Sequence, residues 1–363
     1  MDLLRTRIDL GAIAHNTRLL KELVGAVRLM AVVKADGYNH GAVDVARTML
    51  ANGADALGVA TLAEAHALRE AGIRAPLLAW IWSPEQDFRA AIAADIELGI
   101  PTTAHAKALI DAAAPARVAL KLDTGLHRSG LDETEWEPVF RALKTAEHLE
   151  VTGLFSHLAS ADDPADPETD RQAERFRSAL NLARDIGLET PCNHLCNSPA
   201  TLTRPDLHFQ QVRVGLACYG LEPVPGLAHG LKPAMSWEAS VAAIKPIAAG
   251  EGSSYGLTWR AAQDGQLALV PCGYADGLPR AAQGHLEVGI NGQRYPQVGR
   301  VCMDQFVVDL GENPQEVSPG DTVTIFGEGG MSATELADGL GTINYEVVCR
   351  PTGRTVRTIL EEN

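Results

Sequence analysis

The run Leu29-Met30-Ala31-Val32-Val33-Lys34 consists of consecutive apolar residues that end in a lysine. A short apolar run without polar alternation is typical of a strand that is buried on both faces of a parallel sheet. The stretch that follows it, 41–52, has the apolar spacing of an amphipathic helix. A buried strand followed by a helix is the unit from which α/β folds are built.

This strand–helix order continues through the first two thirds of the chain. Further strands are expected at 56–60, 77–81, 95–99, 118–123, 151–157, 192–196 and 211–217. Helical patterns fill most of the intervals, at 41–52, 62–71, 104–113, 135–148 and 170–186. Eight strand–helix units over about 210 residues predict a (β/α)8 TIM barrel. An open doubly wound sheet is the alternative, but no G-x-G-x-x-G motif follows the first strand.

The sequence changes character after about residue 225. A Pro- and Gly-rich stretch at 222–233 predicts a linker. Short β-rich runs follow it, at 239–247, 266–272, 286–290, 297–301, 305–310 and 321–326, with one helix at 332–340. Asn291-Gly292 predicts a hairpin turn. We therefore expect a barrel domain at 10–228 and a smaller, mostly β domain at 229–363, with which residues 1–9 pair.

Composition excludes several classes of protein. Of the 363 residues, 46% are hydrophobic and 21% are charged, which favours a folded chain over a disordered one. A net charge of −15 disfavours nucleic acid as a partner. No apolar run is long enough for a membrane helix, and early charges argue against a signal peptide, so we expect a cytoplasmic protein.

Six cysteines in a chain of this length do not indicate a disulfide scaffold. The spacing of Cys192, His194 and Cys196 raises the possibility of a zinc site, but it does not match a zinc knuckle and no second pair of ligands lies nearby. We interpret these residues as part of the core near a strand end, and we expect no metal.

Polar residues follow five of the expected barrel strands, at their C-terminal ends. In a barrel these ends meet on one face, where the active sites of such enzymes lie. The residues are Lys34, Lys121 with Asp123 and Arg128, Ser156 with His157, Asn197 with Ser198, and Arg213. Taken singly, each is more typical of a surface or structural role, and it is the coincidence that points to a site. Several cations that share one funnel need anions such as carboxylates or a phosphate.

A lysine at the mouth of a barrel can form a Schiff base with a carbonyl compound. Pyridoxal 5′-phosphate (PLP) supplies an aldehyde, a phosphate and a ring nitrogen. Backbone N–H groups near Ser198 and near Gly215-Leu216 could hold the phosphate. These residues alone do not select PLP over another phosphate.

Longer motifs carry a family resemblance. The segment Ala31–Gly41, with Lys34, resembles the cofactor-lysine segment of bacterial alanine racemases, which are fold-type III PLP enzymes. The resemblance continues, in order, over 121–130, 197–198, 212–215, 254–256, 273–277, 298–305 and 343–346. It covers nearly the whole chain, and the combination of motifs is far more specific than any one of them.

The resemblance implies a two-base racemisation of alanine. Lys34 would bind PLP as a Schiff base and act as one base, and Tyr255 would act as the other, on the opposite face of the bound amino acid. The phosphate would be held by Tyr38, Ser198, Gly215, Leu216 and Tyr345, with Asn197 beside them. Arg213 would face the pyridine nitrogen with His157 behind it. Arg128, Met303 and Asp304 would bind the substrate.

The family also implies properties beyond the single site. Its members are head-to-tail homodimers in which Tyr255, Met303 and Asp304 reach the partner's barrel. A carbamylated lysine often stands at the position of Lys121, where its negative charge would lie beside Arg128. The implied product is D-alanine for peptidoglycan, and serine is a second candidate substrate.

The sequence departs from the family in the loop after Lys34. The family usually has Asn-Ala-Tyr-Gly where this chain has Asp36-Gly37-Tyr38-Asn39, and Leu126 replaces a common Met. Two other functions remain open. A fold-III PLP decarboxylase would use a catalytic cysteine, for which Cys302 is the candidate. A PLP carrier protein would be a barrel without the β domain.

Overall fold

The computed structural model describes residues 2–360 and divides into two compact units. One unit comprises Ile13–Gly37 and Gly41–Lys232, which we call the barrel unit. The other comprises residues up to Ala12, Tyr38–His40 and residues from Pro233 onward, which we call the β unit. Between residues 2 and 360, every helix is too short or too polar to cross a lipid bilayer.

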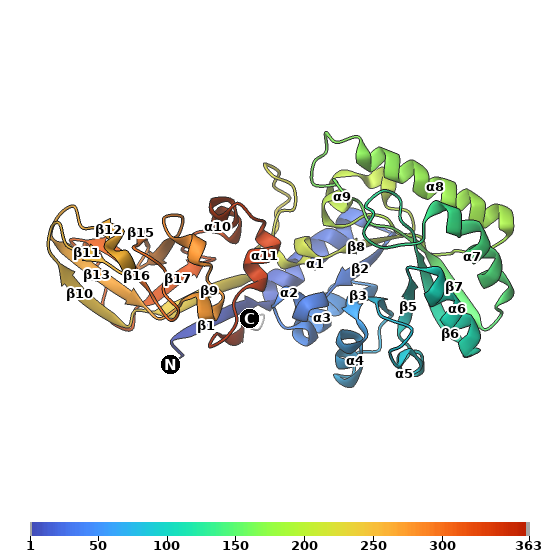
Figure 1. Cartoon of the computed structure of the whole chain (residues 1–363), viewed down its shortest axis with the longest axis horizontal. Helices are drawn as coiled ribbons and strands as arrows, with labels where there is room; N and C mark the ends of the chain where they lie inside the picture. Colours follow the sequence, from blue (N-terminus) through green and yellow to red (C-terminus); the bar gives the residue numbers. More distant parts are fainter. Residues whose placement is uncertain (1, 361–363) are drawn as a thin grey trace. The chain divides into compact units, whose positions relative to one another are not determined.

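Seven parallel strands form the sheet of the barrel unit, in the order β7-β6-β5-β4-β3-β2-β8 (Figure 1). They are β2 (Arg28–Val32), β3 (Ala56–Thr61), β4 (Leu77–Ile81), β5 (Glu97–Ile100), β6 (Ala116–Lys121), β7 (Leu149–Phe155) and β8 (Gln211–Val214). Their burial is nearly continuous, as expected of strands covered on both faces.

Helices alternate with these strands along the chain. They are α1 (Leu10–Val24), α2 (Lys34–Tyr38), α3 (Ala42–Ala51), α4 (Leu62–Glu70), α5 (Phe88–Ala93), α6 (Thr103–Ala112), α7 (Glu133–Thr145), α8 (Glu168–Ile186) and α9 (Ser198–Thr203). Capping boxes begin α4 at Thr61 and α7 at Asp132. The prediction of a TIM-type barrel is confirmed.

The expected strand at 192–196 is wrong in detail. The segment forms isolated parallel bridges, from His194 to Phe155 of β7 and to Gln211 of β8. Because β7 and β8 are the two edges of the sheet, these bridges close it into a ring. The ladder is irregular because the Asn193 side chain, rather than a backbone carbonyl, accepts the Leu154 N–H at 2.9 Å.

The β unit is built on a nine-stranded sheet in the order β10-β13-β16-β15-β14-β17-β9-β1-β18. Its strands are β1 (Leu4–Asp9), β9 (Met235–Ser240), β10 (Ala243–Ile247), β13 (Gly265–Val270), β14 (Glu287–Ile290), β15 (Gln293–Val298), β16 (Phe306–Gly311), β17 (Thr322–Phe326) and β18 (Val356–Leu360). The N-terminal strand β1 pairs with β9 and, in parallel, with β18. A mostly β second domain is therefore confirmed.

Smaller elements complete the β unit. They are the strands β11 (Gly252–Ser253) and β12 (Trp259–Arg260), the helices α10 (Ala333–Leu340) and α11 (Asn344–Cys349), and the 3-10 turns η3 (Tyr255–Leu257) and η4 (Tyr274–Asp276). The predicted hairpin joins β14 to β15, with Asn291 and Gly292 both at positive φ. The strand expected at 297–301 begins earlier, at Gln293, because the two-residue turn pairs Gln293 directly with Ile290.

Candidate active site

The backbone after β2 turns through a left-handed segment that begins at Lys34. Residues 35–39 all have positive φ, between 52° and 67°. L-residues rarely adopt this conformation in succession, so other contacts must hold it. The Asp36 carboxylate accepts the Ala42 N–H at 2.8 Å, and Glu64 accepts the Ala35 N–H at 2.8 Å. Lys34 is half-buried, and the two carboxylates fix the backbone that directly follows it.

The same turn explains the departures from the family motif. Gly37 has φ of +63°, and a Cβ there would lie 2.8 Å from a Val45 methyl group. Asn39, at φ of +67°, is a residue type that tolerates this region. Its side-chain amide donates to the carbonyls of Val348 (3.3 Å) and Pro351 (2.8 Å). Asn39 therefore anchors the turn residues 38–40 to the β unit.

Four cations influence one another at the C-terminal ends of the barrel strands. Burial, followed by the charges of Arg128, Arg213 and Lys34, lowers the pKa of Lys121 to about 8. Burial and the same cations lower the pKa of His157 to about 3, so this imidazole is neutral. Asp123 is the carboxylate that opposes the shift at Lys121. The site therefore has an excess of positive charge that favours an anionic ligand.

Arg213, which is buried at the end of β8, is held by four acceptors. One guanidinium nitrogen donates to His194 Nδ1 and to the His194 carbonyl, both at 2.9 Å. The other donates to the carbonyls of Ser156 (2.5 Å) and Leu195 (3.2 Å). The histidine that accepts from the guanidinium is His194, and the charge of Arg213 also acts on His157, which the resemblance places behind it. Burial lowers the pKa of Arg213 to about 10, which leaves it charged at neutral pH.

A cradle of backbone N–H groups lies beside Arg213. The hydroxyl of Ser198, the first residue of α9, accepts the N–H groups of Gly215 (3.1 Å) and Ala217 (3.3 Å). Because this oxygen accepts twice, its own proton remains to be donated to a ligand. Asn197 caps α9 by accepting the Ala200 N–H at 3.3 Å. Leu216 follows Gly215 and begins a 3-10 turn at the same place.

The β unit carries a second group of predicted residues around a hollow. Tyr255 is 71% exposed and Met303 is 53% exposed. Both line this hollow together with Leu257, Tyr274 and Asp304. The turn that presents Tyr255 is strained, since Ser254, Gly256 and Leu257 all have positive φ. The Ser254 hydroxyl secures it by donating to the Arg300 carbonyl at 2.7 Å.

One residue beside this hollow was missed by sequence reasoning. The Arg354 guanidinium donates two hydrogen bonds to the fully buried carboxylate of Asp276, at 2.7 and 2.8 Å, and one to Asp304 at 2.9 Å. Asp276 lies within the recognised motif 273–277, but nothing local indicates its partner 78 residues away. Elsewhere in the β unit, the rings of Tyr38 and Tyr345 lie 6.2 Å apart.

The zinc alternative has no geometric support among residues 2–360, in which no cluster of three or more ligand-type side chains is found. Cys192 Sγ lies 3.9 Å from Arg28, and Cys196 Sγ donates to the Leu207 carbonyl. His194 Nδ1 is occupied by Arg213. The three side chains therefore serve different partners.

Comparison with known proteins identifies the family. Residues 8–223 match the model of the alanine racemase N-terminal domain, and residues 234–359 match that of the C-terminal domain. The chain is 66% identical to an alanine racemase of Corynebacterium efficiens over 360 residues, which is 98% of each chain. The chain belongs to the alanine racemase family.

Solved structures of alanine racemases have the same fold. The alanine racemase of Corynebacterium glutamicum superposes with a TM-score of 0.92 at 60% identity, over 99% of this chain and 100% of that one. The enzyme of Streptomyces lavendulae gives a TM-score of 0.96 at 40% identity, over 100% and 98%.

Within this family fold, the predicted site residues fall into one group in each unit. The barrel unit brings together Lys34, Lys121, Arg128, His157 and Arg213, with Asn197, Ser198, Gly215 and Leu216. The β unit holds Tyr38, Tyr255, Met303, Asp304 and Tyr345.

Proposed function

We propose that this protein interconverts L-alanine and D-alanine with PLP as its cofactor, and that it supplies D-alanine for peptidoglycan. The observation that carries the proposal is a group of four cations that includes Lys34, within a chain of the alanine racemase family. A cofactor phosphate and a substrate carboxylate would provide the negative charge that this group lacks.

The residues of the barrel unit fit PLP. Lys34 provides the primary amine that binds the aldehyde. The Ser198 hydroxyl and the N–H groups near Gly215 and Leu216 would hold the phosphate, with Asn197 beside them. The resemblance adds Tyr38 and Tyr345, which belong to the β unit. Arg213, fixed by its four acceptors, would face the pyridine nitrogen. When bound, PLP supplies the electron sink that makes the alanine Cα–H bond acidic.

Racemisation requires a proton to leave one face of Cα and another to arrive on the opposite face. We assign these steps to the Lys34 amine and the Tyr255 phenol. Lys34 is the primary amine of the cationic group at the strand ends, and its charge acts on Lys121. The Tyr255 side chain is 71% exposed, and the Ser254 hydroxyl holds the backbone turn that carries it.

The substrate pocket is assigned to Arg128, Met303 and Asp304. Arg128 would bind the carboxylate, which keeps that group in place so that only the Cα–H bond breaks. Arg354 holds Asp304 at 2.9 Å and thereby fixes one wall. A small pocket favours alanine as first substrate and serine as second.

We further infer a homodimer, in which Tyr255, Met303 and Asp304 of the partner subunit complete each barrel site. The support is the exposed apolar hollow of the β unit, where Tyr255, Leu257, Tyr274 and Met303 are between 45% and 71% exposed. Apolar patches of this kind are typical of protein interfaces. The cytoplasm is the proposed compartment, since all six cysteines are free thiols.

Lys121 is the proposed site of carbamylation. Its pKa of about 8 leaves a substantial neutral fraction at neutral pH, and only the neutral amine adds CO2. The carbamate would place a negative charge beside Arg128. Native mass spectrometry should show a mass increment of one CO2 that Lys121→Gln lacks.

The alternative functions have weaker support. A decarboxylase is not favoured, because the chain matches alanine racemases over its whole length. The β unit argues against a PLP carrier made of a barrel alone.

Exchange of the α-proton in D2O tests the proposed function. The wild type should incorporate deuterium into both enantiomers of alanine and interconvert them without releasing CO2. In Tyr255→Phe, racemisation should fall by about 10²–10⁴-fold, the usual contribution of a general base, while one enantiomer still exchanges at Lys34. Wild-type protein that binds PLP without exchanging the proton would contradict the proposal and favour a carrier.

A further inference from the structure

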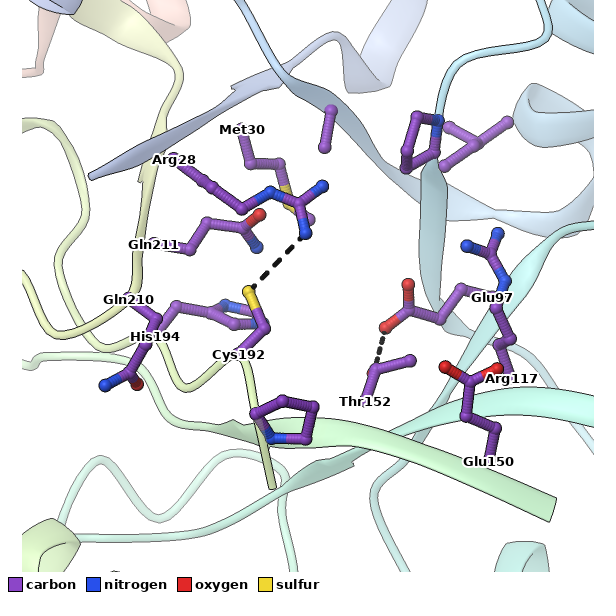
Figure 2. A pocket seen from close by; sticks show the side chains of 14 residues that line it. Arg28, Met30, Glu97, Arg117, Glu150, Thr152, Cys192, His194, Gln210 and Gln211 are labelled. Atoms are coloured by element: carbon purple, nitrogen blue, oxygen red, sulfur yellow. Dashed lines mark hydrogen bonds between the residues drawn. The ribbon is translucent and has the colours of Figure 1, made fainter. Parts of the chain in front are cut away.

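A second cavity lies in the barrel unit, at the end opposite the Lys34 group. It is lined by the first residues of several barrel strands, among them Arg28 of β2, Glu97 of β5 and Gln211 of β8 (Figure 2). Lys34, Lys121 and Arg213 lie beyond or near the last residues of their strands, so this cavity is separate from the proposed active site. Its volume of about 420 Å³ is in the range of small-molecule sites.

Glu97 contributes a buried carboxyl group to this cavity. Its side chain is nine-tenths buried, and burial raises the pKa of the carboxyl. One carboxylate oxygen accepts the Thr152 hydroxyl at 2.6 Å. No cation of residues 2–360 lies within ion-pair distance of it. The charges of Arg117, which pairs with Asp95 at 3.2 Å, and of Arg28 act on Glu97 from farther away and partly oppose the shift. A buried carboxylate in this situation favours a cationic partner.

Arg28 contributes the opposite charge from the facing wall. Its guanidinium points into the cavity, where its side-chain contact is Cys192 Sγ at 3.9 Å (Figure 2). Within the described part of the chain, no carboxylate lies within ion-pair distance of Arg28. Arg28 and Glu97 therefore line one cavity with opposite charges and do not pair with each other.

Neutral donors stand on the same side as Arg28. His194 Nδ1 accepts from Arg213, which can only donate, so the His194 proton is on Nε2. His194 and Gln211 both line the cavity. The Arg28 wall is thus suited to a carboxylate, and the Glu97 wall, with the exposed Glu150 beyond it, is suited to an ammonium group.

We propose that this cavity binds a small zwitterion of the α-amino acid class, with its carboxylate toward Arg28 and its ammonium toward Glu97. The two arginines and two glutamates of the lining balance, so a ligand of single charge would leave one wall without a partner. This site is separate from the proposed catalytic site and does not depend on the reaction assigned there.

Methyl NMR of the holoenzyme can test this proposal. One titration reports separately on the barrel cavity and on the hollow of the β unit. The chain has six methionines, of which Met30 lines the barrel cavity and Met303 lines the hollow of the β unit. With [¹³C-methyl]methionine labelling, Met30→Leu and Met303→Leu assign the two resonances. Glycine is the probe, because it carries both charges and has no stereocentre to invert.

Glycine should shift the Met30 resonance to saturation. Propionate and ethylamine, which carry one charge each, should need at least tenfold higher concentrations. Arg28→Gln and Glu97→Gln should each raise the glycine concentration for half-shift at least tenfold. The control Glu137→Gln, an exposed residue of α7 paired with Arg141, should leave it unchanged.

Three results would overturn the proposal. They are a Met30 resonance that glycine does not move, a half-shift concentration that Arg28→Gln does not change, and propionate that binds as well as glycine. Because the Arg28 side chain is exposed, its variant remains informative even if Glu97→Gln fails to fold.

Discussion

Arg213 combines a fixed position with a charge that cannot be removed at neutral pH. Four acceptors hold its guanidinium, whose central carbon lies over the Phe155 ring, 5.5 Å from the ring centroid. An arginine cannot accept a proton from a pyridine nitrogen, whereas a carboxylate at that place would keep the nitrogen protonated. The side chain therefore limits how strongly the proposed cofactor withdraws electrons.

Arg213→Glu should gain transamination as a side reaction. A protonated pyridine withdraws electrons more strongly, so the ratio of pyruvate formed to alanine racemised should rise by at least about tenfold. Coupling to lactate dehydrogenase measures the pyruvate. Arg213→Lys, which keeps a cation, should retain the low ratio. An unchanged ratio in folded Arg213→Glu would refute the assigned role.

Lys121 should make stability depend on pH. Its pKa in the folded chain is about 8, against 10.5 for an ordinary lysine, so the unfolded state binds more protons between these values. The free energy of unfolding should therefore rise from pH 8 to pH 10.5 by up to about 3 kcal/mol. Because a carbamylated lysine does not titrate in this range, the rise is measured by urea denaturation of protein freed of both its cofactor and CO2.

Lys121→Gln should lose that rise, because the variant has no group to titrate. The control Lys107→Gln removes an exposed lysine of α6 and should keep it. Equal slopes in the wild type and Lys121→Gln would show that Lys121 is not the source.

At the scale of elements, closure of the barrel depends on one glycine. A Cβ on Gly153 of β7 would lie 1.9 Å from the Cys192 carbonyl oxygen. Only a residue without Cβ lets the Cys192 backbone lie this close to β7. Two residues later, His194 forms the bridges to β7 and β8. Gly153 of β7 therefore makes room for the irregular segment 192–196, which closes the barrel.

Gly153→Ala should destabilise the protein by about 3 kcal/mol or more, because a backbone oxygen cannot rotate away as a side chain can. Urea unfolding gives the free-energy change. Gly99→Ala of β5 is the matched control, since its Cβ would lie 3.1 Å from the nearest atom. Its free energy of unfolding should fall by clearly less. Comparable losses in the two variants would contradict this account of the closure.

At the scale of the molecule, we propose that two subunits contribute to each active site. The barrel unit holds Lys34 and the β unit holds Tyr255. If each barrel is completed by Tyr255 of the partner subunit, two inactive variants can restore one another. A dimer of Lys34→Ala with Tyr255→Phe would contain one complete site and one site that lacks both residues.

Mixing the two inactive variants under conditions of subunit exchange should therefore recover about a quarter of wild-type activity, because half of the dimers are mixed and each has one intact site. Racemisation is measured by polarimetry, and native mass spectrometry confirms the mixed dimers. As a control, Lys34→Ala mixed with a variant that carries both Lys34→Ala and Tyr255→Phe should recover no activity. Mixed dimers without activity would place both bases in one chain.

Local patterns were sufficient for much of this molecule. Strand and helix periodicity predicted the barrel, because buried parallel strands and amphipathic helices repeat on the scale of a few residues. The polar residues at the strand ends could be identified for the same reason, since each follows its own apolar run. The Asn291-Gly292 hairpin is equally local, because two residues alone set its geometry.

Contacts between distant segments could be found only in the folded chain. His194 accepts a hydrogen bond from Arg213, and Arg354 donates to both Asp276 and Asp304. The Asn39 amide donates to the carbonyls of Val348 and Pro351. Arg28 and Glu97 come to face one cavity because the sheet curves into a ring. Such pairings depend on how the chain packs in three dimensions, and periodicity carries no information about which distant residues will meet.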